Sequence, residues 1–334
     1  MDSEGLNDSS TSSSPSTASP SLLTENESST SLSSSTSLGS IISQSSLPST
    51  LNKWLERVED DKLYHFGWFK SDANLKKIFS DIKFVCTGGS ASRLNAFAEL
   101  FAKHTTTNIT DNLSRTDRYA MWKTGPVLWV NHGMGVPSLS IMLIEVTKML
   151  HYAGATDFQF IRMGTSGGVG VSPGTVIVSS GAVNGLLEQN HTQYIQGKIV
   201  KRDAILDAEL SQGLYDTALE LGLPVDRGLT MCADDFYEGQ MRLDGLFCDY
   251  TAEDKLAFFN KLYRIGVKNI EMESTGFASY TNHAGIPAAI LCVALVNRME
   301  TDQIIVDKGT YHDFELRPFQ IVLHYITKRL SGIL

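Results

Sequence analysis

Six apolar runs alternate along this chain with segments of helical pattern, and this alternation limits the fold more than any other feature. The runs are short, nearly continuous in apolar residues and bounded by glycine or polar turns, as is typical of strands buried on both faces. Strands of this kind separated by helices predict an α/β fold in which helices cover both faces of a central sheet. The runs cover residues 82–87, 127–132, 158–163, 175–180, 228–233 and 288–297.

Three of the intervening segments have helical character and end at a glycine, which commonly terminates helices. The first, residues 138–154, begins at Ser138, whose hydroxyl is suited to an N-cap, and stops at Gly154. Its apolar residues do not fall on one stripe, so we expect the helix to be buried over much of its surface. The other two segments cover residues 211–222 and 254–266.

Residues 1–50 differ in composition from the rest of the chain. Serine occupies 21 of these positions, threonine occupies six more, and the first basic residue is Lys53. Such a polar segment buries too little apolar area to offset the entropy of ordering, and it lacks the basic start and apolar block of a signal peptide. We therefore predict a disordered serine- and threonine-rich tail over residues 1–50 and a single α/β domain over residues 51–334.

The charge of the folded part argues against some classes of partner. Leaving out the five acids of residues 1–50 changes the formal net charge from −9 to −4. A mildly acidic domain has no general attraction for nucleic acid or an anionic membrane, and no run of about 20 apolar residues predicts a membrane-spanning helix. The cysteines form no CxxC pair, which favours buried free thiols in a cytoplasmic protein over zinc ligands or disulfides. They are Cys86, Cys232, Cys248 and Cys292.

Three arginines stand beside features that commonly bind anions. Arg162 ends an apolar run, at the lip of a predicted strand, and precedes a glycine-rich stretch with Thr165 that exposes backbone amides and a hydroxyl. Arg93 follows the glycine turn at residues 88–89, where a strand gives way to a helix whose first amides form an anion nest. Arg118 lies between an acid and an aromatic residue, a pattern also typical of a surface ion pair. Together they predict a site for a phosphate-like anion.

The segment 235–245 carries groups suited to a flat heterocycle. Phe236 offers a stacking face, Gln240 an acceptor and two donors, and Arg242 a fork of donors. Because residues two apart on an extended segment project to the same side, Gln240 and Arg242 together suit an imide edge such as that of uracil. The same pattern is equally typical of a solvent-exposed loop.

The segment 269–277 places two carboxylates two residues apart, at Glu271 and Glu273. One face of the segment is therefore suited to the diol of a sugar, with Met272 packing on the ring. The alternative is a pair of acids at a helix N-terminus, where the helix dipole favours negative charge.

These residues fall within motifs that occur in a fixed order in a known family. By them the chain resembles the nucleoside phosphorylase superfamily, and most closely the animal uridine phosphorylases, from about residue 60 to the C-terminus. The motifs are GGSASR (88–93), TDRYAMW (116–122), HGMGVPS (132–138), RMGTSGG (162–168), DFYEGQMRLDG (235–245), NIEMES (269–274) and VALVNRMETDQI (293–304).

The resemblance implies an activity and a fold. The activity is the reversible phosphorolysis of uridine to uracil and ribose 1-phosphate in pyrimidine salvage and catabolism. The fold is a single catalytic domain, residues 51–334, with a mixed and distorted central sheet flanked by helices. No redox cofactor or metal ion is expected, and inorganic phosphate is a co-substrate.

The resemblance also implies roles for residues at the matching positions. Phosphate would be held by Gly89, Arg93, Arg118, Arg162 and Thr165. Uracil would be held by Phe236, Gln240 and Arg242, with Leu295, Val296 and Ile304 as walls of the base pocket. Ribose would be held by Met272 and Glu273, with Glu271 nearby and His65 at the 5′-hydroxyl. The expected catalytic groups are Arg162, which fixes phosphate, Gln240 and Arg242, which stabilise the departing uracil, and Glu273, which orients the ribose hydroxyls.

His65 and Arg118 are expected to serve the site of a neighbouring subunit, so the resemblance implies a homodimer with shared active sites. In the bacterial branch a glutamate of a monovalent-cation site stands where this chain has Tyr119. The substitution argues against that cation site and favours the animal-type dimer over the bacterial hexamer.

Three alternatives remain open at the level of sequence. A purine nucleoside phosphorylase needs an acid or amide at the purine N7, and Asn297 lies near the equivalent strand end. A nucleosidase uses water, although it has no use for three phosphate-binding arginines. A silent paralogue would bind nucleosides without turning them over. Thymidine and 2′-deoxyuridine also remain open as substrates beside uridine.

Overall fold

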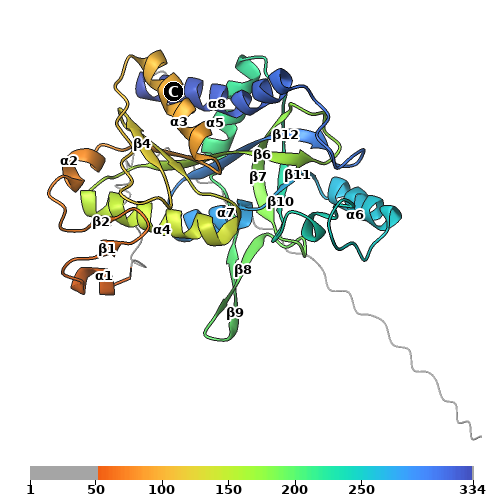
Figure 1. Ribbon diagram of the computed structural model, residues 1–334, viewed down its shortest axis with the longest axis horizontal. Coiled ribbons are helices and arrows are strands. Elements are labelled where there is room, and N and C mark those ends of the chain that lie inside the picture. Colours follow the sequence, from red (N-terminus) through yellow and green to blue (C-terminus); the bar gives the residue numbers. More distant parts are fainter. Residues whose placement is uncertain (1–51, 333–334) are drawn as a thin grey trace, which may run out of the picture. The chain divides into compact units, whose positions relative to one another are not determined.

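The central sheet of the computed structural model, which describes residues 52–332, contains eight strands (Figure 1). The strands are β3 (Phe84–Gly88), β4 (Met121–Thr124), β5 (Val127–Asn131), β6 (Gln159–Gly168), β7 (Val176–Val183), β10 (Val225–Cys232), β11 (Val267–Glu271) and β12 (Ala288–Asn297). Their order is β11-β10-β7-β12-β6-β3-β5-β4. The tail predicted for residues 1–50 lies outside the described residues.

The sheet is mixed in direction and closes on itself along part of its width. The pairs β12–β7, β11–β6 and β4–β5 are antiparallel, and the other neighbouring pairs are parallel. Since β11 pairs with β10 and also with the far end of β6, the strands from β11 to β6 form a closed ring of pairings. The mixed, distorted sheet predicted from the family resemblance is therefore confirmed.

Helices cover both faces of the sheet, as the alternation of runs predicts. The helices are α1 (Trp54–Arg57), α2 (Leu75–Phe79), α3 (Ala91–Thr105), α4 (Gly135–Ala153), α5 (Ala208–Glu220), α6 (Ala252–Arg264), α7 (Ser274–His283) and α8 (Lys308–Leu330). In Figure 1 α3, α5 and α8 lie above the sheet and form one apolar core with it, while α4 and α7 lie below and form a second core with α2. Helix α6 packs beside β10 and β11 over a third, smaller core.

Strand β12 shows why these runs are apolar throughout. Ile290 and Cys292 belong to the core beneath the sheet, whereas Leu291 and Val293 belong to the core above it. Successive side chains of a strand point to opposite faces, so a strand covered on both sides requires an apolar residue at every position. All six predicted strands are present, β12 with the predicted bounds.

Three local predictions need correction. Helix α4 begins at Gly135, and Ser138 lies within its first turn with its hydroxyl donating to the His132 carbonyl, so Ser138 is not the N-cap. Strand β6 continues to Gly168, so Arg162 lies inside the strand and not at its lip. Cys86, Cys232 and Cys292 are buried free thiols, but Cys248 is exposed.

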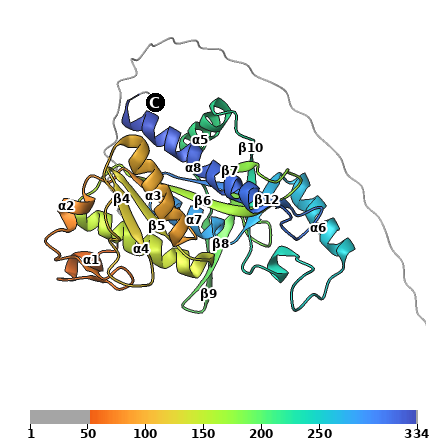
Figure 2. The same cartoon turned by 45° about the horizontal axis from the view of Figure 1, so that its top comes forward.

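Two small sheets lie outside the central one. Strands β1 (Lys62–Leu63) and β2 (Trp68–Phe69) form one, and β8 (Asn190–Ile195) and β9 (Lys198–Asp203) form a hairpin that projects from the sheet in Figures 1 and 2. Gln196 and Gly197 both have positive φ, which matches the tight turn preferred in two-residue hairpins. None of the helices in the described part of the chain is long and apolar enough to cross a membrane.

Candidate active site

A cavity of about 640 Å³ opens at the carboxyl ends of β3, β5, β6, β11 and β12 and beneath the segment that follows β10. Crevices at the carboxyl ends of strands are the usual ligand sites of open α/β sheets. Every site residue predicted from the sequence lines this cavity except His65 and Arg118.

The end of β3 supplies the corner of the cavity for which the sequence predicts an anion. Gly89 and Arg93 line it where α3 begins, and the hydroxyl of Ser90 accepts from the Arg93 backbone N–H as the helix cap. A Cβ on Gly89 would lie 3.0 Å from the Gly133 carbonyl oxygen, so this close approach of two loops favours glycine. The Arg93 guanidinium lies 3.1 Å from Glu315 on α8, and this ion pair aligns it beside the cavity.

Arg162 is the most heavily engaged arginine of the site. It is only 2% exposed, and its guanidinium forms ion pairs with Glu271, at 2.7 Å, and with Glu273. Its Nη1 also donates to the sulfur of Cys292 on β12. The sequence predicts an arginine presented to a ligand, whereas the structure buries it against two carboxylates, which neutralise its charge in the interior.

The two carboxylates are not equivalent. Glu271 accepts hydrogen bonds from the backbone N–H groups of Glu273 and Ser274 and so caps α7, and its burial raises its pKa. Burial alone would raise the pKa of Glu273, but the positive charge of Arg162 and the hydrogen bonds from Gly135 and Arg162 are among the contributions that together outweigh it and hold this pKa below its usual range. Glu273 additionally accepts from the N–H of Gly135. The alternative of acids at a helix N-terminus describes both residues, since Glu273 is the N-cap residue of α7 and Glu271 accepts from the first backbone N–H of that helix, and both carboxylates also line the cavity.

Another side of the cavity is built by the segment after β10, for which the sequence predicts a flat heterocycle. Gln240 ends a 3₁₀ turn, Glu238–Gln240, and Met241 has a positive φ of 52°. The prediction of an extended segment here is therefore wrong. Gln240 and Arg242 nevertheless line the same cavity. The guanidinium of Arg242 stacks 4.5 Å from the ring centroid of Phe236, which is 48% exposed at the rim.

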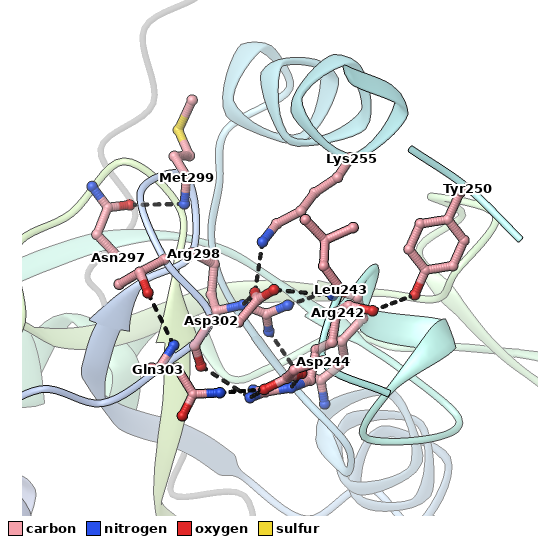
Figure 3. Close-up of polar contacts among 12 residues, drawn as sticks. Arg242, Leu243, Asp244, Tyr250, Lys255, Asn297, Arg298, Met299, Asp302 and Gln303 are labelled. Carbon is pink, nitrogen blue, oxygen red and sulfur yellow. Dashed lines mark hydrogen bonds and ion pairs between the residues drawn. The ribbon is translucent and has the colours of Figure 1, made fainter. Parts of the chain in front are cut away.

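Arg242 is held by Asp244 of its own segment (Figure 3), and Gln240 is held by a residue that follows β12. Asp244 accepts from Nε of Arg242 at 2.8 Å and from its Nη2 at 2.7 Å. Arg298, which follows β12, donates from Nη1 to Oε1 of Gln240 at 3.2 Å and from Nη2 to its carbonyl at 2.8 Å. The groups that face the cavity are therefore fixed before any ligand arrives.

The wall of the cavity carries the predicted apolar residues. Leu295 and Val296 come from the irregular end of β12, Ile304 from the loop beyond it and Met272 from the end of β11. Asn297 is the residue for which the alternative of a purine nucleoside phosphorylase remained open. Its side chain accepts from the N–H of Gly170 and donates to Glu300, and it does not line the cavity.

His65 and Arg118 lie outside the cavity of their own chain. Nδ1 of His65 is 2.7 Å from Glu145 on α4. Arg118 is largely exposed, and its ion-pair partner within residues 52–332 is Asp117, at 3.8 Å. Tyr119 is buried against Phe66 with ring centroids 5.2 Å apart, and its hydroxyl donates to the Ser138 carbonyl.

His132 and Arg298 are among the cavity-lining residues to which the sequence analysis gave no role. His132 follows β5 and accepts from Nε of Arg162, and burial together with the charge of Arg162 lowers its pKa to about 3. His132 ends one apolar run and Arg298 directly follows another, and both lie inside motifs that the sequence analysis quotes. Their position at strand ends could therefore have identified them as candidate site residues.

A cavity lined by arginines, carboxylates and an amide–arginine pair has the groups that suit a nucleoside and an anion. Residues 83–327 match the sequence profile of the phosphorylase superfamily. A uridine and thymidine phosphorylase of Caenorhabditis elegans is 53% identical over 84% of this chain and 96% of its own length. The crystal structure of a Schistosoma mansoni uridine phosphorylase in complex with uracil superposes with a TM-score of 0.80 at 42% identity, over 85% of this chain and all of that one. An inactive uridine phosphorylase B of the same organism is 38% identical over 85% of this chain and 97% of its own.

The chain belongs to the phosphorylase superfamily and, within it, to the uridine phosphorylases of animal type.

Proposed function

We propose that this protein catalyses the reversible phosphorolysis of uridine to uracil and ribose 1-phosphate. The observation that carries the proposal is the row of hydrogen-bonding groups at the base end of the cavity. Within residues 52–332 neither Nε2 of Gln240 nor Nη1 of Arg242 has a hydrogen-bond partner, and Oε1 of Gln240 accepts only from Arg298. The cavity thus offers a donor, an acceptor and a donor, which complement O2, N3–H and O4 of uracil.

The catalytic argument is electrostatic. The glycosidic bond breaks through a sugar cation while negative charge passes to the base, and the donors of Gln240 and Arg242 stabilise that charge as uracil leaves. Phosphate, held by Gly89, Arg93 and Thr165 next to Arg162, is both the nucleophile and the counter-charge of the sugar cation.

Glu273 binds and orients the ribose hydroxyls. Its carboxylate stays ionised beside Arg162, so it accepts hydrogen bonds from a diol bound between the phosphate and base ends. Met272 packs beneath the ring, and Glu271 acts indirectly by fixing Arg162 and the start of α7.

The active unit is a homodimer in which His65 and Arg118 complete the site of the partner subunit. Support comes from their place outside their own cavity and from the exposed guanidinium of Arg118.

We further propose that the protein acts in the cytoplasm, in pyrimidine salvage, with its activity in residues 51–334 and a dispensable tail over residues 1–50. It works without a cofactor, and no group of His, Cys, Asp and Glu in the described range could hold a metal ion.

Thymidine is a second candidate substrate. The Caenorhabditis elegans relative is named for both nucleosides, and thymine presents the same imide edge as uracil to Gln240 and Arg242.

One assay separates these functions from the alternatives. Release of uracil from uridine is measured with and without phosphate, with thymidine, inosine and cytidine as parallel substrates. Phosphate-dependent release from uridine is the expected result. Release without phosphate would identify a nucleosidase, turnover of inosine a purine enzyme, and binding without turnover a silent paralogue.

A further inference from the structure

A buried ion cluster in the wall of the cavity joins three separate segments around Asp302 (Figure 3). Its Oδ1 accepts from Nζ of Lys255 on α6 at 2.6 Å and from Nε of Arg298 at 2.7 Å. Its Oδ2 accepts from the backbone N–H of Leu243, two residues before the end of the base-binding segment 235–245, at 3.0 Å. The side chains of all three charged residues are at most 11% exposed, so solvent weakens these contacts little.

Arg298 connects Asp302 to Gln240, the residue that faces the base. Its Nε is held by Asp302, while Nη1 and Nη2 donate to the side chain and the carbonyl of Gln240. An arginine has donors and no acceptor, so only the oxygen of the Gln240 amide can face it. The amide nitrogen of Gln240 must then point away from Arg298, and the amide has one orientation.

We propose that Asp302 is a positioning residue that, through Arg298, fixes the Gln240 amide in the orientation that admits uracil and rejects cytosine. The inference rests on the proposed function and adds the device that sets its base specificity.

The chemistry of the two bases explains the selectivity. Uracil presents an acceptor, a donor and an acceptor at O2, N3–H and O4, whereas cytosine presents two acceptors followed by a donor. With Oε1 of Gln240 fixed, cytosine would place its N3 lone pair against an oxygen and its amino group against Nη1 of Arg242. If the amide turned over, uracil would be mismatched at O2 and at N3–H, whereas cytosine would only exchange its mismatch at N3 for one at O2. Loss of the fixed orientation therefore weakens the binding of uracil and leaves cytosine mismatched in either orientation, so the preference for uracil falls.

The test compares Asp302→Asn with Asp313→Asn. Both substitutions remove a carboxylate paired with an arginine four residues away. Asp302 and Arg298 lie in the cavity wall, whereas Asp313 and its partner Arg317 on α8 do not line the cavity. For Asp302→Asn we expect the ratio of kcat/KM for uridine to that for cytidine to fall at least about tenfold, the size of effect that one charge-assisted hydrogen bond supports. KM for uridine should rise while KM for phosphate stays within about twofold, and Asp313→Asn should behave as the unsubstituted protein.

A folded Asp302→Asn protein with an unchanged ratio, or with equal losses for uridine and phosphate, would overturn the inference. If that variant does not fold, Arg298→Lys replaces it, because lysine keeps the charge beside Asp302 but cannot also donate twice to Gln240. Calorimetric binding of uracil and cytosine in saturating phosphate measures the same discrimination without turnover. Failure of the unsubstituted protein to cleave uridine would therefore reject the proposed function, whereas equal affinities for the two bases, or a preference for uracil that Asp302→Asn retains, would reject the positioning role.

Discussion

Nε of Arg162 donates a hydrogen bond to Nε2 of His132 across 3.3 Å, and both side chains are almost completely buried. Because an arginine can only donate, Nε2 of His132 must carry a lone pair, and the ring is neutral. Burial and the adjacent positive charge lower the pKa of His132 to about 3. The imidazole therefore orients Arg162 without adding a second positive charge to this part of the cavity.

This neutrality predicts a pH dependence of stability. The folded pKa of about 3 lies below the usual value of 6.5, so between these values the unfolded chain binds a proton that the folded chain does not. The contribution of the neutral His132 to the free energy of unfolding is therefore complete above pH 6.5. It is lost as the pH falls toward 3, by about 1.4 kcal/mol per pH unit. In His132→Gln the free energy of unfolding, measured in urea from pH 4.5 to 7, should fall less steeply with acid. His104→Gln, at an exposed position of α3, is the control, and equal slopes in all three proteins would contradict a neutral buried ring.

Replacing Arg162 should cripple phosphorolysis. A charge-assisted hydrogen bond contributes roughly 1.5–3 kcal/mol, so Arg162→Ala is expected to lose at least about tenfold in kcat/KM for phosphate. The alanine variant also leaves Glu271 and Glu273 buried without their counter-charge, so its folding must be checked by thermal denaturation. Arg162→Lys keeps the charge without the fork of donors and should show the same direction of change. Normal phosphate kinetics in either folded variant would remove Arg162 from the site.

The sequence predicts the parts of this fold whose signal is local. Strand β12 is apolar at nearly every position because both of its faces are covered, and its bounds could be read directly. The hairpin of β8 and β9 was missed because its strands are polar and partly or fully exposed, Tyr194 at 80% and Ile199 at 66%, and no apolar period marks them.

The site was predictable as a set of residues but not as a set of contacts. The cavity-lining positions follow from strand ends and from the family motifs. The pairing of Arg162 with Glu273 joins residues 111 positions apart in the chain, and it depends on the antiparallel contact of β11 with β6, which no local pattern encodes. For the same reason Arg298 could not be linked to Gln240 from the sequence, since a register shift in β12 between Ala294 and Val296 precedes the turn that carries it.

Removing residues 1–50 should leave catalysis and the melting temperature nearly unchanged. A segment in which serine fills 21 of 50 positions has few apolar side chains with which to pack on the rest of the chain. The measurement compares uridine phosphorolysis and thermal denaturation of the full chain and of residues 51–334. A large loss of either quantity would show that the tail folds onto the domain.

The shared active site is tested by mixing two inactive proteins. If His65 and Arg118 act in the partner's site, each site combines the Arg162 of one chain with the His65 and Arg118 of the other. In a dimer of a His65→Ala, Arg118→Ala chain with an Arg162→Ala chain, the first chain's site keeps its own Arg162 and receives intact partners, so it is whole. The second chain's site carries all three substitutions.

Mixing should therefore restore uridine phosphorolysis, up to one working site in each mixed dimer. The physical ground is that both residues lie outside their own cavity, Arg118 with an exposed guanidinium, while a bound phosphate needs its positive partners placed closely around it. If both residues served their own chain, each site of the mixed dimer would keep one set of substitutions, and activity would not return. The measurement is activity after co-expression of differently tagged chains, with mixed dimers isolated through both tags. Mixed dimers without regained activity would show that the two residues do not complete the partner's site.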